Sequence, residues 1–215
     1  DLSWDTVKVE CDSKQTSGDW VDLGLPSGLQ WATRNVGASS PTDYGNYYAW
    51  GETTPKSVYD WSTYRYARYD SERDSYYLTK YCNNSSSGYN GFTDGLTTLQ
   101  PGDDAATANY GGRTPTKAEW EELVNNTTSR WMTINGVNGL CFTGPNGNSL
   151  FLPAAGRRRD GSLYDAGSYG YYWSSSLYTD YPNDAWYCRF YSGNVYVYGS
   201  GIRGYGHAVR AVRQP

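Results

Sequence analysis

Residues 186–198 read WYCRFYSGNVYVY, two runs of alternating residue types on either side of a Ser192-Gly193-Asn194 turn. Successive side chains of a strand point to opposite faces, so this pattern predicts a hairpin of two half-buried strands. The inner face is predicted to hold the apolar set Trp186, Cys188, Phe190, Val195 and Val197. The outer face is predicted to hold Tyr187, Arg189, Tyr191, Tyr196 and Tyr198. A solvated strand face ordinarily carries Lys, Glu, Thr and Ser, so the tyrosines and arginine of the outer face require an explanation.

The composition predicts short strands, turns and long ordered loops. The chain has 215 residues, enough to bury a sizeable core, and is most simply one domain. It contains 25 Gly, 23 Tyr and 9 Trp but only 4 Phe and 1 Met. This excess of turn formers and amphipathic rings is unusual for a globular chain and does not favour helices.

The charge and hydropathy of the chain argue against several classes of partner. The net charge is −4, and Arg157-Arg158-Arg159 is the one basic run. Nucleic acid and anionic membranes require a concentrated positive field, so neither is expected as a partner. No segment approaches the roughly 18 apolar residues of a membrane span, and no signal peptide is recognised. Because it starts at Asp1, we expect the chain to be part of a longer product.

The four cysteines, at positions 11, 82, 141 and 188, are too widely spaced for zinc-binding Cys-x-x-Cys pairs. They allow three disulfide connectivities, which the sequence does not separate. Cys188 lies on the predicted inner face of the hairpin and is interpreted as a small buried hydrophobic residue.

The segment TPTKAEWEELVNN, residues 114–126, predicts the one clear helix. Thr116 is its expected N-cap, and Glu119 three residues later completes a capping box. Trp120, Leu123 and Val124 then form an apolar stripe at helical spacing. A second, shorter helix is expected to start at Thr42, although Gly45 weakens that prediction.

Strand and turn patterns cover most of the remaining chain. A second hairpin is predicted around Pro145-Asn146-Gly147. Trp50 and Trp173 are expected in the core, where their indole N–H groups need acceptors. Residues 53–112 are polar and lack periodicity, which predicts a long ordered loop packed on the scaffold or, alternatively, a partly disordered insertion. Further strands are expected in segments 19–25, 29–37, 47–52, 171–176 and 207–213.

Six motifs resemble the C-type-lectin-like domains of Bacteroidetes surface proteins, which are related to the formylglycine-generating enzymes. They are VDLGLPSGLQWATRNVG (21–37), YYAWGETTP (47–55), RTPTKAEWEEL (113–123), GPNGNSLFLPAAG (144–156), GSYGYYWSSS (167–176) and HAVRAVR (207–213). The resemblance implies an α+β fold of the C-type-lectin type, with mainly short antiparallel strands, one or two helices and long ordered loops. It places the domain at residues 19–215, after an N-terminal extension or linker at residues 1–18.

Within this group the chain resembles the variable proteins of diversity-generating retroelements, in which template adenines are copied with errors. Relatives tend to have Asn where this hairpin has Tyr, and randomising the two adenines of an Asn codon that ends in a pyrimidine yields Tyr, Arg, His, Asp, Gly, Ser, Cys and others. It never yields Lys, Glu, Gln or Met. Residues 1–173 contain fifteen residues of these four types, whereas residues 174–213 contain none, against a proportional share of three to four. The resemblance therefore implies a variable region at about 174–213.

Tyrosine gives a large contact area with few torsions to immobilise, and arginine adds a planar fork of donors. The outer face is therefore predicted to bind a protein or glycan on another cell or surface. Cross-strand ring pairing, or cover by the tyrosine-rich residues 59–89, would explain the same residues without binding. The expected setting is the cell surface or the secreted state, as an outer-membrane lipoprotein or on a phage particle. The predicted ligand-binding residues are Tyr178, Asp180, Tyr181, Asn183, Asp184, Tyr187, Arg189, Tyr191, Tyr196, Tyr198, Arg203, Tyr205 and His207.

Two other functions compete with this prediction: a carbohydrate-binding adhesin that is not diversified, and an oxidase of the formylglycine-generating type. The oxidases of the resembling branch use a pair of cysteines near the C-terminus, where Cys188 stands alone, so no enzyme activity is expected. His207, the single histidine, is interpreted as a surface contact. No cofactor is expected, because YPND at 181–184 lacks the acidic first residue of calcium-dependent lectin motifs; calcium bound by other oxygen ligands is left open. Arg157–Arg159 is interpreted as a solvated turn, with an anion-binding loop as the alternative.

Overall fold

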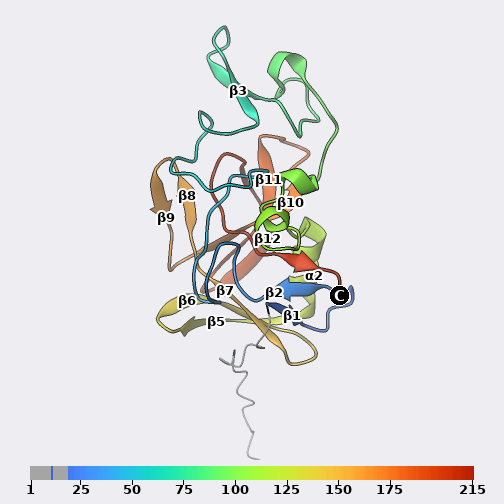
Figure 1. Cartoon of the computed structure of the whole chain (residues 1–215), viewed down its shortest axis with the longest axis vertical. Helices are drawn as coiled ribbons and strands as arrows, with labels where there is room; N and C mark the ends of the chain where they lie inside the picture. The colour runs from blue at the N-terminus through green and yellow to red at the C-terminus, as the bar shows by residue number, and fades with distance from the viewer. Residues whose placement is uncertain (1–10, 12–18) are drawn as a thin grey trace, which may run out of the picture.

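The computed structural model describes Cys11 and residues 19–215 (Figure 1). The predicted extension at residues 1–18 therefore lies outside the described residues, except for Cys11. Two of the three-stranded sheets differ in how local they are: one joins segments far apart in the chain, and the other contains the predicted second hairpin. The first contains β1 (Trp20–Asp22), β2 (Gln30–Ala32) and β13 (Val212–Arg213), and the second contains β5 (Thr128–Ile134), β6 (Val137–Thr143) and β7 (Ser149–Pro153).

A third three-stranded sheet carries the opening hairpin, and two hairpins complete the strands. The third sheet contains β10 (Gly170–Leu177), β11 (Asp184–Tyr191) and β12 (Asn194–Ile202). The two hairpins are β3 (Ala67–Asp70) with β4 (Ser75–Leu78), and β8 (Arg157–Arg159) with β9 (Ser162–Tyr164). The helices are α1 (Ala105–Asn109), α2 (Lys117–Asn126) and two single 3-10 turns, η1 (Tyr89–Gly91) and η2 (Pro101–Asp103).

The predicted α+β fold of the C-type-lectin type is wrong. In the described part of the chain, five small antiparallel sheets dominate, and the longest helix has ten residues. The helix expected from Thr42 does not form, because Gly45 adopts the left-handed conformation that ends it, with a φ of 69°. The region between residues 53 and 112 contributes the β3–β4 hairpin, the short helix α1 and two single 3-10 turns.

Helix α2 forms where the sequence predicts it. The Thr116 hydroxyl accepts the Glu119 N–H, and the Glu119 carboxylate accepts the Thr116 N–H, so the capping box is complete. Trp120 and Leu123 are the fully buried residues of its apolar stripe. The Trp120 indole packs against the rings of Trp31 and Tyr172, which fixes the helix between β2 and β10.

The β10–β11–β12 sheet has one closed face. The rings of Tyr172 and Phe190 stack on that face at 5.8 Å between centroids. They lie beneath Trp120 of α2 on one side and Trp131 of β5 on the other. Helix α2 and the β5–β6–β7 sheet therefore cover this side. On the opposite side Tyr171 and Trp173 are also buried, whereas Tyr187, Arg189, Tyr191 and Tyr196 are partly exposed.

A β-bulge divides strand β12. Tyr187 pairs with Gly199 and Arg189 pairs with Tyr196, so Val197 and Tyr198 together lie opposite Cys188. An extra residue reverses the alternation beyond it, because side chains alternate strictly only along a regular strand. The predicted hairpin is confirmed, but its outer face changes sides at Tyr198.

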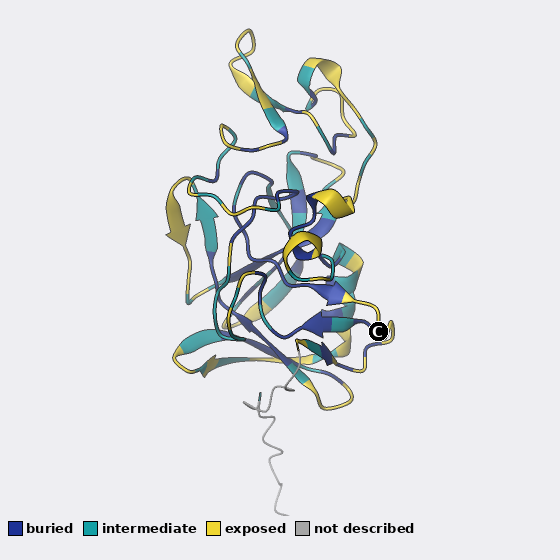
Figure 2. Ribbon diagram, viewed as in Figure 1, coloured by how far each residue is buried: buried dark blue, intermediate teal, exposed yellow. Residues whose placement is uncertain are grey.

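Residues 53–112 form ordered structure packed on the same core. Tyr59, Tyr64, Tyr66 and Tyr81 are buried in the main hydrophobic cluster. The β3–β4 hairpin projects from the body, and its tip is exposed (Figures 1 and 2). The prediction of an elaborated loop packed on the scaffold is therefore confirmed over the partly disordered alternative.

Several long-range contacts hold the sheets together. The predicted acceptors of the core indoles exist: Trp50 Nε1 donates to the Ser174 carbonyl and Trp173 Nε1 to the Tyr48 carbonyl, both at 2.8 Å. Cys11 and Cys141 form a disulfide, whereas Cys82 and Cys188 are buried free thiols.

Candidate functional site: a tyrosine and arginine face

The open side of the β10–β11–β12 sheet carries a continuous cluster of rings and guanidinium groups. We call it the Tyr/Arg face: Arg157, Tyr169, Tyr171, Tyr187, Arg189, Tyr191 and Tyr196. Its rings lie in sequence against one another, from Tyr187 to Tyr171 at 5.8 Å, Tyr171 to Tyr169 at 6.0 Å and Tyr169 to Tyr191 at 5.3 Å between centroids. The row ends with Tyr191 stacked on Tyr196 at 6.1 Å. Except for Tyr171, each of these side chains is half-buried, so each presents an edge to solvent.

Strand register explains why these residues meet. Tyr171 lies opposite Arg189, and Arg189 lies opposite Tyr196, so three adjacent strands contribute to one row. Directly opposite side chains share a face at close range. Tyr171 is buried at the centre of the face, and its hydroxyl donates to Asp165 at 3.1 Å. Burial raises the pKa of Tyr171 to about 12, so the hydroxyl stays protonated at neutral pH.

The two arginines of this face differ in their partners. Arg157 lies over the Tyr171 ring and pairs with Asp165 at 3.6 Å. Arg189 lies over the Tyr196 ring at 5.2 Å, and within the described residues it has no carboxylate partner. A guanidinium that rests on a ring with its donor fork free is pre-positioned for an external acceptor.

Two glycines give the face its shape around Tyr187. A Cβ at Gly199 would lie 2.7 Å from the Tyr187 ring, and one at Gly201 would lie 2.8 Å from it. The ring therefore lies flat across β12 because neither position carries a side chain. This close approach requires glycine and keeps Tyr187 level with its neighbours.

Tyr198 and Tyr178 are not part of this face. The bulge turns Tyr198 toward α2, where Lys117 Nζ lies 5.2 Å from its ring, and the ring is 72% exposed. Tyr178 packs edge-on against Trp186, whose ring also lies beneath Lys117. The predicted position of Tyr198 beside Tyr196 on the outer face is therefore wrong.

Arg203 is a core residue, contrary to its predicted surface role. It is fully buried and donates to the Tyr64 hydroxyl and to the carbonyls of Lys80, Tyr81 and Pro182, each at 2.9 Å. These acceptors come from three distant segments. A buried charge requires such a complete set of partners, so Arg203 joins residues 64–81 to the loop before β11.

His207 is also buried, and the prediction of a surface contact is wrong. Its ring stacks on Trp173 at 3.8 Å and meets the edge of Tyr187 at 5.2 Å. Neither ring nitrogen has a hydrogen-bond partner among the described residues. Burial and the nearby Arg157 hold the pKa of His207 well below its usual value, so the imidazole is neutral where it contacts Tyr187.

The remaining predicted residues lie at the margins. Tyr181 is exposed and accepts a 3.3 Å hydrogen bond from Asn183, and Asp180 is exposed beside it. Asp184 accepts from Ser200 Oγ at 2.9 Å, and burial raises the pKa of its carboxyl group. Tyr205 lies beside Arg159 of β8. The structure thus brings together four predicted residues, Tyr187, Arg189, Tyr191 and Tyr196, and leaves the others outside the face.

Sequence reasoning missed Arg157, Tyr169 and Tyr171. The first belongs to the basic run interpreted as a turn, which is strand β8 in the structure. The other two alternate in YGYYW, residues 169–173, a period-two signal that could have identified them. That segment was assigned to the core because of Trp173.

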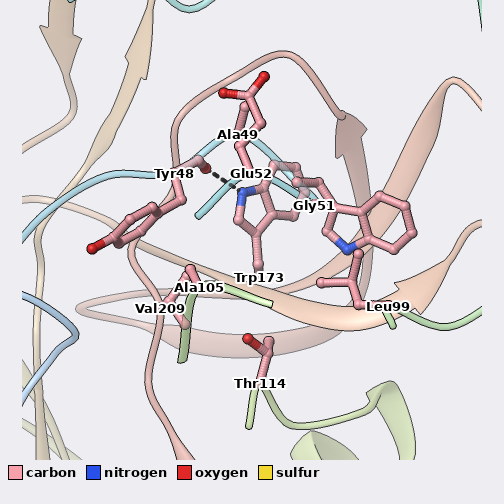
Figure 3. A pocket seen from close by; sticks show the side chains of 10 residues that line it. Tyr48, Ala49, Gly51, Glu52, Leu99, Ala105, Thr114, Trp173 and Val209 are labelled. Carbon is pink, nitrogen blue, oxygen red and sulfur yellow. Dashed lines mark hydrogen bonds between the residues drawn. The ribbon is translucent and has the colours of Figure 1, made fainter. Parts of the chain in front are cut away.

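One interior cavity is too small to hold a ligand. A cavity beside Trp173 is lined by Leu99, Ala105 and Thr114 and has a volume of about 10 Å³ (Figure 3). This is space for about one water molecule. In the described part of the chain, no three His, Cys, Asp or Glu side chains gather as metal ligands, and no helix is long and apolar enough to cross a membrane.

Comparison with known families and structures reaches only the C-terminal part of the chain. No curated protein and no solved structure matches it. A family model described as a domain of unknown function, DUF8237, matches residues 142–212. These residues include every member of the Tyr/Arg face, so over this stretch the chain is similar to that family.

Proposed function

We propose that this chain is a ligand-binding module of the receptor or adhesin type, that it binds a protein or glycan through the Tyr/Arg face, and that a retroelement diversifies this face. The observation that carries the proposal is the position of Arg189. Its guanidinium is half-buried on the Tyr196 ring, without a carboxylate partner among the described residues, in the middle of four half-buried tyrosines. Interface hot spots are enriched in these two residue types.

The rigidity of the sheet supports the same proposal. The rings lie on paired strands whose other side is packed against α2 and β5, so their positions are fixed before any ligand arrives. Tyr191 and Tyr196 also share a 3.3 Å hydrogen bond between their hydroxyls, and Asn194 donates to Tyr196. Little conformational entropy is then lost on binding, which favours affinity.

The disulfide agrees with a cell-surface or secreted setting. Disulfides persist mainly in oxidising compartments, and Cys11–Cys141 joins residues far apart in the chain. The two free thiols offer little to the competing oxidase function, because Cys82 and Cys188 are fully buried. Burial raises the pKa of both thiols, which disfavours the reactive thiolate.

Sequencing this locus in many sibling cells tests the diversification. Differences should cluster at codons 187, 189, 191 and 196 and be confined to template adenines. The codons of Arg203 and His207 should be spared, because both side chains are buried. Scattered neutral differences would remove the retroelement and leave an adhesin that is not diversified.

Binding is tested by flow cytometry of the labelled protein on bacterial and host cells, together with a glycan array. A Tyr191→Ser and Tyr196→Ser double variant should lose binding on every surface that the parent chain labels. Tyr198→Ser is the matched control, since this more exposed tyrosine lies on the other side of the same strand. Equal loss in the control, or full binding by the double variant, would contradict the proposal.

A further inference from the structure

The basic run Arg157–Arg159 is a strand whose three guanidinium groups have different surroundings. Each lies over a tyrosine ring: Arg157 over Tyr171, Arg158 over Tyr47 and Arg159 over Tyr164. The first and last also have carboxylate partners, Asp165 at 3.6 Å and Asp160 at 3.8 Å. Arg158 has none among the described residues, so its charge is the one left uncompensated in β8.

Arg158 lines an open hollow of about 650 Å³ on the side of β8 away from the Tyr/Arg face. This volume lies within the usual range of small-molecule sites. The lining residues include Lys56 and Arg158 but no Asp or Glu. Lys56 is already paired with Glu52 at 2.9 Å, so Arg158 is the free cation of the hollow.

The position of Arg158 is fixed from several directions. Its backbone exchanges two hydrogen bonds with Gly206, at 2.7 and 2.9 Å. Its guanidinium carbon lies 5.3 Å from the centre of the Tyr47 ring. Hydrogen bonds hold that ring in place. The Tyr47 hydroxyl donates to the Ala155 carbonyl, and the Tyr47 carbonyl accepts from the Tyr59 hydroxyl at 2.6 Å. The donor fork is therefore presented to the hollow by a pre-organised support.

The rest of the lining is polar and uncharged. Asn46 and Ser57 are exposed at the hollow, together with the backbone of Gly45 and Gly161. Hydroxyl-rich ligands are bound by such groups, whereas a planar guanidinium matches the two oxygens of a carboxylate. A single free cation suits a monoanion better than a phosphate dianion.

We propose that this hollow binds a carboxylate-bearing sugar, of the size of one or two rings, with Arg158 holding the carboxylate. The site is separate from the Tyr/Arg face, because successive residues of β8 point to opposite sides. If the hollow does not bind such a sugar, the proposed function of the Tyr/Arg face is unaffected. If the Tyr/Arg face does not bind a ligand, the proposal for the hollow is likewise unaffected.

Titration of the whole chain with D-glucuronate, followed by amide NMR, tests the proposal. Chemical-shift changes are expected at the amides of Gly45 and Gly161. D-glucose should bind with an affinity at least about tenfold lower, because it lacks the carboxylate. Inorganic phosphate distinguishes a general anion site. Equal binding of glucose, tighter binding of phosphate, or no shifts with glucuronate would each overturn the proposal.

Two pairs of variants assign the binding. Arg158→Gln should lower the affinity for glucuronate at least about tenfold. Arg159→Gln, one residue away on the other side of the strand, should leave that affinity unchanged. Ser57→Asp places a carboxylate in the hollow without removing the support of Tyr47, and Ser57→Asn is its neutral control. Loss in Ser57→Asp with retention in Ser57→Asn keeps the test decisive even if Arg158→Gln unfolds. Unchanged affinity in Ser57→Asp would contradict the site.

Discussion

The hairpin β11–β12 and the segment that follows it, residues 203–213, use similar residues for opposite purposes. In the hairpin, Arg189 rests on a ring with its donors free. In the following segment, Arg203 and Arg210 are fully buried, and each guanidinium donates to acceptors from distant parts of the chain. The residue type does not decide whether an arginine is structural or available. The number of backbone carbonyls within its reach does.

The same comparison holds for the rings. His207 is sealed between Trp173 and Tyr187, whereas Tyr191 and Tyr196 present their edges to solvent. The following segment thus forms the floor on which part of the hairpin surface rests. Removal of a residue from the floor should change the free energy of unfolding, and removal from the surface should change binding.

The largest effect is expected from Arg203→Ala. It would leave three buried carbonyls and the Tyr64 hydroxyl without their donor, so the free energy of unfolding should fall by about 3–5 kcal/mol. Urea unfolding measures this change. Arg189→Ala is the matched control, with an expected loss below about 1 kcal/mol. Similar losses in the two variants would break the comparison.

The next effect is a pH dependence that His207 produces. In the unfolded chain a histidine titrates near pH 6.5, whereas burial keeps His207 neutral in the folded chain. The unfolded state therefore binds the extra proton as the pH falls. The contribution of His207 to the free energy of unfolding is fully present above about pH 6.5. Below that pH it decreases by up to about 1.4 kcal/mol per pH unit.

His207→Leu should remove that part of the slope. Urea unfolding from pH 7.5 to 5 gives the free energy of unfolding of the parent and of the variant. Their difference removes the contribution of the carboxyl groups, which both chains share. Among these is Asp184, whose raised pKa changes stability with pH in the opposite direction. A difference that does not change with pH would show that His207 gains a proton in the folded state.

A smaller effect is expected from Gly199→Ala. The added Cβ would lie 2.7 Å from the Tyr187 ring, so the ring must move, at a cost of about 1–2 kcal/mol. Gly102→Ala, where a Cβ would meet nothing within 4 Å, is the control. Thermal unfolding measures both variants, and equal melting temperatures would show that Tyr187 is not held by the glycine.

The smallest effect on stability is expected from Tyr196→Ser. Its ring contacts are with Tyr191 and Arg189 at the edge of the sheet, and such cross-strand pairs contribute below about 1 kcal/mol. Chemical unfolding should therefore differ little from that of the parent chain. A loss of several kcal/mol would identify the Tyr/Arg face as a structural ring cluster rather than a binding surface.

Local patterns in the sequence were sufficient for the elements that depend on them. Helix α2 with its capping box, both hairpins, and the burial of Trp50 and Trp173 with bonded indoles agree with the prediction, because capping, alternation and indole burial act over a few residues or through one strong requirement. The fold class was not. Arrangement of five small sheets depends on contacts between segments more than a hundred residues apart, such as β2 with β13.

The candidate site shows the same limit. Tyr187, Arg189, Tyr191 and Tyr196 follow from alternation, whereas the departure of Tyr198 requires knowledge of the bulge. The burial of Arg203 and His207 depends on residues 48, 64, 80–81 and 173, which no local pattern connects to them. Tyr169 and Arg157 join the face because a bridge pairs Gly156, the residue before β8, with Gly170, the first residue of β10.

The bulge at Val197 and Tyr198 has a consequence for how mutations in this strand are interpreted. Upstream of it, even-numbered residues such as Tyr196 lie on the side of the Tyr/Arg face; downstream, odd-numbered residues such as Gly199 lie on that side. A one-residue insertion or deletion between Tyr196 and Gly199 would therefore exchange the roles of a whole half-strand. Substitutions at Tyr196 and Tyr198 should therefore be tolerated better than changes in length, and natural variants should preserve the spacing even where they replace these side chains.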